Sequence, residues 1–117
     1  MNTEMPPEFA VSAEPVGSAY VVAPLGELDL GTVDELSATL AARPDACPRL
    51  VLDLSGLTFF DTSGIRLVVE TLQDARRSGI SLALVRGSED VQRLFALAGM
   101  DDRLPFFDDL DEALAQR

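Results

Sequence analysis

The stretch LVLDLSGLTFFDTSGIRLVVE, residues 50–70, contains the change of pattern that decides the fold. Its first residues, Leu50–Leu54, are almost continuously apolar, which is typical of a β strand covered on both faces. Further on, the apolar residues recur with helical spacing, and this predicts a helix from about Thr62 to Arg77. A buried strand that leads into a helix is the repeating unit of α/β folds with parallel strands.

Two further strands are expected near the start of the chain. Phe9–Glu14 alternates in character, and Ser18–Leu28 is predominantly apolar. Val16 and Gly17 suit a tight turn, so the two strands are expected to pair as an antiparallel hairpin. Pro24 cannot donate a hydrogen bond to a sheet, and it predicts an edge, a bulge or a strand end at its position.

Helices and strands alternate along the rest of the chain. Thr32 and Glu35 match a capping box at the start of a helix that ends at Pro44. After another buried strand, Ser88 and Gly99 suit the N-cap and the C-cap of a third helix. A short final strand and a terminal helix follow. The expected fold class is therefore α/β, with helices packed on one mixed sheet that is antiparallel in the N-terminal hairpin and largely parallel elsewhere.

The composition disfavours several classes of function. The chain has 20 acidic and nine basic residues, a formal net charge of −11, and its basic residues are arginines scattered along the sequence. Nucleic acids and anionic membranes are bound through clustered positive charge, so neither is an expected partner. The sequence has no histidine, which excludes imidazole metal sites and Ser-His or Cys-His catalytic pairs. We predict no metal, no cofactor and no catalytic residue.

The length of 117 residues suits one domain, which is expected over residues 9–117 after a disordered lead-in of residues 1–8. No apolar run approaches the roughly 18 residues that a membrane span needs, so no membrane insertion is expected. The single cysteine, Cys47, allows no internal disulfide, and this suits a cytoplasmic protein.

The DTSG segment at residues 61–64 has two interpretations. Asp61 suits the N-cap of the helix, because its carboxylate can accept unpaired amide protons at the positive end of the helix dipole. Capping alone would explain such a residue. Gly64 costs roughly 0.5–1 kcal/mol relative to alanine inside a helix, which indicates close approach of another element or of a partner. The alternative interpretation is that a hydroxyl is presented for modification.

Helical phase separates the two hydroxyls of this segment. The apolar residues that recur at helical spacing define the expected buried face: Ile65, Val68, Val69 and Leu72. Thr62 is expected near that face, whereas Ser63 is about 200° from Ile65 and is expected to point outward. Arg66 and Leu67 are helical neighbours of Ser63, so an exposed serine and an exposed leucine are expected to form a contact surface.

Phosphorylation of Ser63 would suit this position. A phosphate adds nearly two negative charges and is favoured at a helix N-terminus, where Arg66 is placed to pair with it. Asp61 and the acidic surface would repel it. The helix is therefore expected to survive the modification while the contact surface changes, which describes a binding switch.

Three segments of the chain resemble the STAS domains, specifically the small bacterial anti-sigma factor antagonists. They are GELDLGTVDEL at 26–36, LVLDLSGLTFFDTSGI at 50–65 and VQRLFALAGMDDRLPFFDDLDEAL at 91–114. The resemblance implies partner switching. The unmodified protein binds an anti-sigma factor that is also a serine kinase of the GHKL ATPase type, and a sigma factor is released. The kinase phosphorylates the signature hydroxyl, the complex weakens, and a serine phosphatase resets the protein.

The resemblance also assigns residues. Ser63 corresponds to the phosphorylated hydroxyl, Thr62 is the second candidate, and Asp29 is expected to border the same surface. Thr62 stands where serine is more usual in the family, which bears on partner specificity. The residues expected to bind the partner are Asp29, Asp61, Thr62, Ser63, Gly64, Arg66 and Leu67.

Two other functions remain as alternatives. The first is a STAS subunit of an ABC-type lipid transport complex, which can carry similar motifs without being phosphorylated. The second is an enzyme, such as a small hydrolase or a nucleotide-binding protein. The sequence disfavours an enzyme, because it has no P-loop or dinucleotide glycine pattern and no histidine to activate Ser63.

Overall fold

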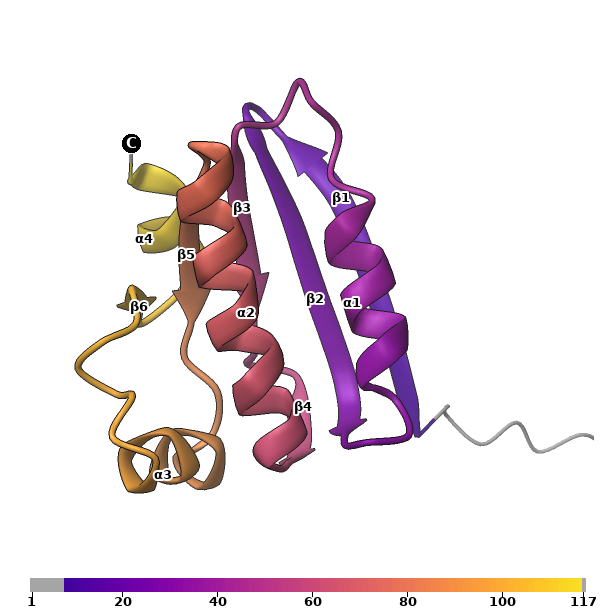
Figure 1. The fold of residues 1–117 in the computed structure, drawn as a ribbon, viewed down its shortest axis with the longest axis vertical. Helices are drawn as coiled ribbons and strands as arrows, with labels where there is room; N and C mark the ends of the chain where they lie inside the picture. The colour runs from indigo at the N-terminus through magenta and orange to yellow at the C-terminus, as the bar shows by residue number, and fades with distance from the viewer. Residues whose placement is uncertain (1–7, 117) are drawn as a thin grey trace, which may run out of the picture.

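The computed structural model describes residues 8–116, which form one sheet with helices packed on it (Figure 1). The expected disordered lead-in, residues 1–8, lies outside the described residues apart from Glu8. Within residues 8–116, no helix combines the length and the apolar character that a membrane crossing requires.

The described residues form six strands and four helices, and all the predicted elements are present. The strands are β1 Phe9–Val16, β2 Ala19–Leu28, β3 Arg49–Asp53, β4 Leu57–Phe60, β5 Ser81–Val85 and β6 Phe106–Phe107. The helices are α1 Val33–Ala41, α2 Thr62–Ser78, α3 Glu89–Leu97 and α4 Leu110–Ala115. The short strand β4 is the element that the sequence pattern did not predict.

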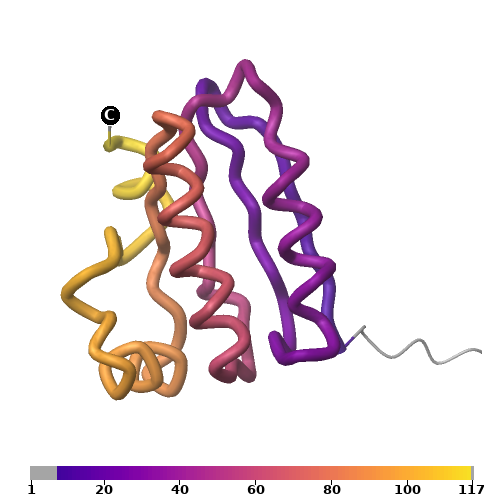
Figure 2. Tube along the Cα trace, viewed as in Figure 1, coloured from indigo at the N-terminus to yellow at the C-terminus, as the bar shows by residue number. Residues whose placement is uncertain are grey.

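The predicted mixed sheet is confirmed. Its strand order is β1-β2-β3-β5-β6, and β4 pairs separately with β2. The β1–β2 hairpin is antiparallel, while each of the other pairings is parallel. Because α1, α2 and α3 connect parallel strands, the loops that enter α1 and α2 lie at the same end of the molecule (Figure 2).

The long strand β2 has two parallel partners in succession. Its first half pairs with β3 as far as Val22, and its second half pairs with β4 from Gly26 onward. Pro24 lies between these two segments, where a residue without an N–H removes no bond from the parallel ladder. At the end of β2, Leu28 is paired with Phe60 of β4. The loops that follow these two residues therefore start side by side.

The two faces of the sheet bury separate sets of side chains. Leu50 and Leu52 belong to the larger core, which also receives residues from α1, α2 and α3. Val51 points the opposite way and packs with Ala113 of α4 in the smaller core. This arrangement confirms that Leu50–Leu54 is covered on both faces. It also places α1 and α2 together on one face, with α4 on the other (Figure 1).

A candidate partner-binding site between α1 and α2

Asp61 is the N-cap of α2, as the sequence predicts. Its backbone is extended, and its Oδ1 accepts a hydrogen bond from the Ser63 main-chain nitrogen at 2.9 Å. The Ser63 hydroxyl donates to the same oxygen. The carboxylate therefore caps the helix and also holds the hydroxyl of Ser63 in one orientation.

Gly64 allows close packing inside the protein. A Cβ atom at this position would lie 2.3 Å from Cε2 of Phe60 and 3.0 Å from Cδ2 of Leu28. Of the two possibilities that the sequence left open, close approach of another element is confirmed. Gly64 is buried, so any contribution to partner binding is indirect, through the position of the first turn of α2.

The predicted orientation of α2 is partly wrong. Leu67, expected to be exposed beside Ser63, is only 8% exposed. Thr62, expected near the buried face, is exposed, and Ser63 is half-buried. The physical reason is that α1 packs beside α2. The side of α2 that faces α1 is therefore buried as well. The buried stripe of α2 consists of Gly64, Leu67, Val68, Thr71 and Ala75.

The loop from β2 to α1 is held by hydrogen bonds around Asp29. Oδ1 of Asp29 accepts from the Gly31 nitrogen at 2.9 Å. The Thr32 hydroxyl accepts from the Asp29 nitrogen at 2.9 Å and donates to the Glu27 carbonyl oxygen at 2.9 Å. The predicted capping box of Thr32 and Glu35 is therefore wrong, because the hydroxyl turns back into the loop and makes no cap bond. Asp29 shapes the loop, and its Oδ1 is already engaged there.

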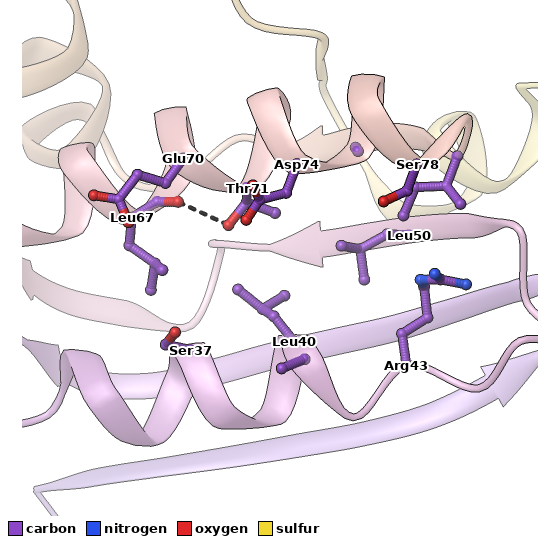
Figure 3. Close-up of a pocket in the computed structure, with 12 residues that line it drawn as sticks. Ser37, Leu40, Arg43, Leu50, Leu67, Glu70, Thr71, Asp74 and Ser78 are labelled. Atoms are coloured by element: carbon purple, nitrogen blue, oxygen red, sulfur yellow. Dashed lines mark hydrogen bonds between the residues drawn. The ribbon is translucent and has the colours of Figure 1, made fainter.

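A groove runs between α1 and α2, and Ser63 is one of the residues in its wall. Its outer part has a volume of about 420 Å³ and is lined by Leu30, Val33, Asp34, Ser37, Thr62, Ser63, Arg66, Leu67 and Glu70. The groove continues along both helices as a second hollow of about 210 Å³. Figure 3 shows Ser37 and Leu40 of α1 facing Leu67 and Thr71 of α2 across this inner part.

The groove brings together four of the predicted partner-binding residues: Thr62, Ser63, Arg66 and Leu67. The other three, Asp29, Asp61 and Gly64, lie next to it and fix its walls. The sequence did not single out Leu30, although one signal was present. It is a lone leucine in a loop, between Asp29 and Gly31.

The charges of the groove are mixed and mainly acidic. Asp34, Glu70 and Arg66 line its outer part, and Asp74 and Arg43 line its inner part. Within residues 8–116, the ion pairs join Arg77 to Asp74, Arg86 to Asp108 and Arg93 to Asp90. Arg66 takes part in none of these and keeps its charge available at the groove.

Comparison with known proteins assigns the family. The family model of the STAS domain matches residues 10–113 of the sequence. The chain therefore belongs to the STAS domain family. The anti-sigma-B factor antagonist of Staphylococcus aureus is 32% identical over 84 residues, which cover 71% of this chain and 78% of that protein.

Solved structures share the fold. The crystal structure of an anti-sigma factor antagonist from Mycobacterium paratuberculosis has a TM-score of 0.80 at 27% identity, with 91% of each chain covered. The phosphorylated form of the Bacillus cell fate determinant SpoIIAA has a TM-score of 0.69 at 22% identity, with 88% of this chain and 94% of that chain covered.

Proposed function

We propose that the chain is an anti-sigma factor antagonist that works by partner switching. Its unphosphorylated form binds an anti-sigma factor that is also a serine kinase of the GHKL type, and so frees a sigma factor. Phosphorylation of Ser63 ends the binding, and a serine phosphatase restores it. The observation that carries the proposal is Ser63 in the wall of the α1–α2 groove, with its hydroxyl oriented by the N-cap Asp61.

The hydrogen bond between Ser63 and Asp61 favours Ser63 over Thr62 as the switch. Phosphorylation replaces the proton that Ser63 donates to Asp61, so that a phosphate faces a carboxylate. The first turn of α2 must rearrange locally in response. Thr62 also lines the groove, but its hydroxyl makes no hydrogen bond within the described residues, so its modification would disturb less.

The switch acts mainly on the surface of the protein. A phosphate on Ser63 adds nearly two negative charges beside Asp34 and Glu70. The amides and the dipole at the start of α2 tolerate this charge, and Arg66 lies one helical turn away. We therefore expect the fold to persist while the charged, strongly hydrated phosphate disrupts the apolar contact between the groove and its partner.

In this function the chain is a substrate and a ligand. The kinase carries out the phosphoryl transfer, and the chain itself needs no metal or cofactor. The similarity to proteins named as anti-sigma factor antagonists supports a regulatory function. Such a function places the protein with its sigma factor in the cytoplasm.

The proposal is tested first in the cells that produce the protein. Intact mass and peptide mapping, with and without stress, should show a phosphate on Ser63 whose occupancy changes. In vitro, each purified GHKL-type serine kinase of the source genome is incubated with ATP and the wild-type chain, Ser63→Ala or Thr62→Ala. We expect Ser63→Ala to remain unmodified and Thr62→Ala to be phosphorylated. A chain that stays unmodified in cells and with every kinase would contradict the proposal and favour the transport-subunit alternative.

A further inference from the structure

Leu30 is the most exposed large apolar residue of the described chain. Its side chain is 79% exposed, in the loop between β2 and α1. A single exposed leucine is ordinary on a protein surface and needs no explanation by itself. The position and the rigidity of this leucine carry the argument.

The loop holds Leu30 in a defined place. The Asp29 carbonyl oxygen accepts hydrogen bonds from the nitrogens of Thr32, at 3.1 Å, and Val33, at 2.9 Å. The Asp29 carboxylate accepts from the Gly31 nitrogen on the other side of Leu30. The main chain around Leu30 is therefore fixed before any partner arrives, and little main-chain entropy is lost when a partner buries the side chain.

Leu30 lies at the site where phosphorylation would act. It lines the same outer part of the groove as Ser63, which is on the α2 wall. Leu67, which the sequence suggested as the apolar contact beside Ser63, is 8% exposed and cannot supply it. Leu30 thus provides the exposed apolar group that the contact surface would otherwise lack.

The charges around Leu30 indicate the chemistry of what it contacts. Asp34 and Glu70 line the outer part of the groove, with Arg66 as the single basic residue of that part. A complementary surface is apolar where it meets Leu30 and basic around that point.

We propose that Leu30 is the apolar anchor of the partner-binding surface, and that it enters a hydrophobic socket bordered by basic side chains on the anti-sigma kinase. This inference rests on the proposed function and adds to it a residue on whose burial the affinity depends. Interface energies are concentrated in a few well-buried side chains, so removal of such an anchor has a large effect.

The test compares two leucines of nearly equal exposure. Leu97 on α3 is 77% exposed and does not line the groove, so Leu97→Ala is the matched control for Leu30→Ala. Binding to the purified full-length GHKL-type kinases of the source genome, loaded with ADP, is measured by calorimetry. Leu30→Ala should weaken binding by about tenfold or more, and Leu97→Ala should stay within about twofold of the wild-type chain. Thermal unfolding should be nearly unchanged in both variants, because both side chains are exposed.

The charge part of the inference has its own variants. Asp34→Asn with Glu70→Gln should weaken binding and reduce its dependence on salt, because both acids would face basic groups of the partner. If the affinity of the wild-type chain for the kinase does not fall with added salt, the proposal that basic side chains border the socket is overturned.

The possible failures are distinguishable. If the wild-type chain binds a kinase and Leu30→Ala binds equally well, the anchor is wrong and the proposed function stands. If the wild-type chain binds none of the kinases, both the anchor and the proposed function are overturned.

Discussion

Asp61 accepts two hydrogen bonds from Ser63 through one oxygen atom, Oδ1, which receives both the main-chain N–H and the side-chain hydroxyl. A single carboxylate thus stabilises the start of α2 and orients the residue proposed to be modified. Under the proposed function, stability and recognition are coupled at this residue, and substitutions there can separate the two effects.

Replacing Asp61 by alanine should lower the free energy of unfolding by about 1 kcal/mol, because the first turn of α2 loses its cap. Urea denaturation measures this loss. Asp61→Asn is the matched control, since an asparagine oxygen still caps while the charge is gone. Equal denaturation midpoints for Asp61→Ala and the wild-type chain would show that the cap contributes nothing.

Gly64→Ala should destabilise the protein although alanine is the better helix former. The new methyl group would lie 2.3 Å from the Phe60 ring, so α2 or the ring must shift, and we expect a loss of about 1–3 kcal/mol. The measurement is again urea denaturation, with the double variant Gly64→Ala, Phe60→Leu made in parallel. Partial recovery in the double variant would identify the ring as the cause, whereas a stabilised Gly64→Ala protein would refute the close packing.

Arg49→Ala should loosen the terminal helix. Nη2 of Arg49, on β3, donates to the carbonyl oxygen of Leu114 at 2.7 Å and to that of Ala113 at 3.3 Å. Hydrogen bonds from charged donors contribute about 1.5–3 kcal/mol, and without them α4 should open more often. Amide hydrogen exchange should be faster in α4 and unchanged in α2. Equal exchange rates of the α4 amides in Arg49→Ala and in the wild-type chain would show that the contact does not hold α4.

Phe95→Ala should be the most damaging of these substitutions. Phe95 is fully buried, and its ring lies 5.0 Å from that of Phe60 and 5.1 Å from that of Phe106, measured between centroids. Its removal leaves a cavity between β4, α3 and β6, so we expect a loss of about 3–5 kcal/mol. Leu97→Ala, on the same helix but exposed, should change stability by less than about 0.5 kcal/mol. Thermal and urea unfolding compare the two.

Features fixed by neighbouring residues were predictable from the sequence. Asp61 and Ser88 cap their helices, as expected for acidic and hydroxyl residues that precede a helical pattern. Gly79 ends α2 in a left-handed conformation that glycine adopts without strain. Gly99 has the same conformation, although it lies one residue beyond the C-cap, which is Ala98 and not Gly99 as predicted. Each of these outcomes depends on a few residues close together in the chain.

Features set by distant residues were not predictable in the same way. Leu67 is buried because α1 lies beside α2, and the periodicity of α2 alone does not reveal that neighbour. The hydroxyl of Thr32 had two competing sets of partners, and the carbonyl of Glu27 was favoured over the helix amides. The four residues of β4 form a strand because β2 extends beyond β3 and offers them a partner. For the same reason, the outer part of the groove and the place of Leu30 in it emerged only from the three-dimensional structure.

The pairing of Leu28 with Phe60 also bears on how such proteins can diverge. The Asp29 and Asp61 loops leave the sheet from these paired residues, so main-chain hydrogen bonds set the spacing between the two sides of the site. Exposed positions such as Leu30 and Thr62 are free to change without moving this frame. Duplicated copies within one genome could therefore acquire separate partners through a few surface substitutions, and signalling pathways built on the same fold could stay insulated from one another.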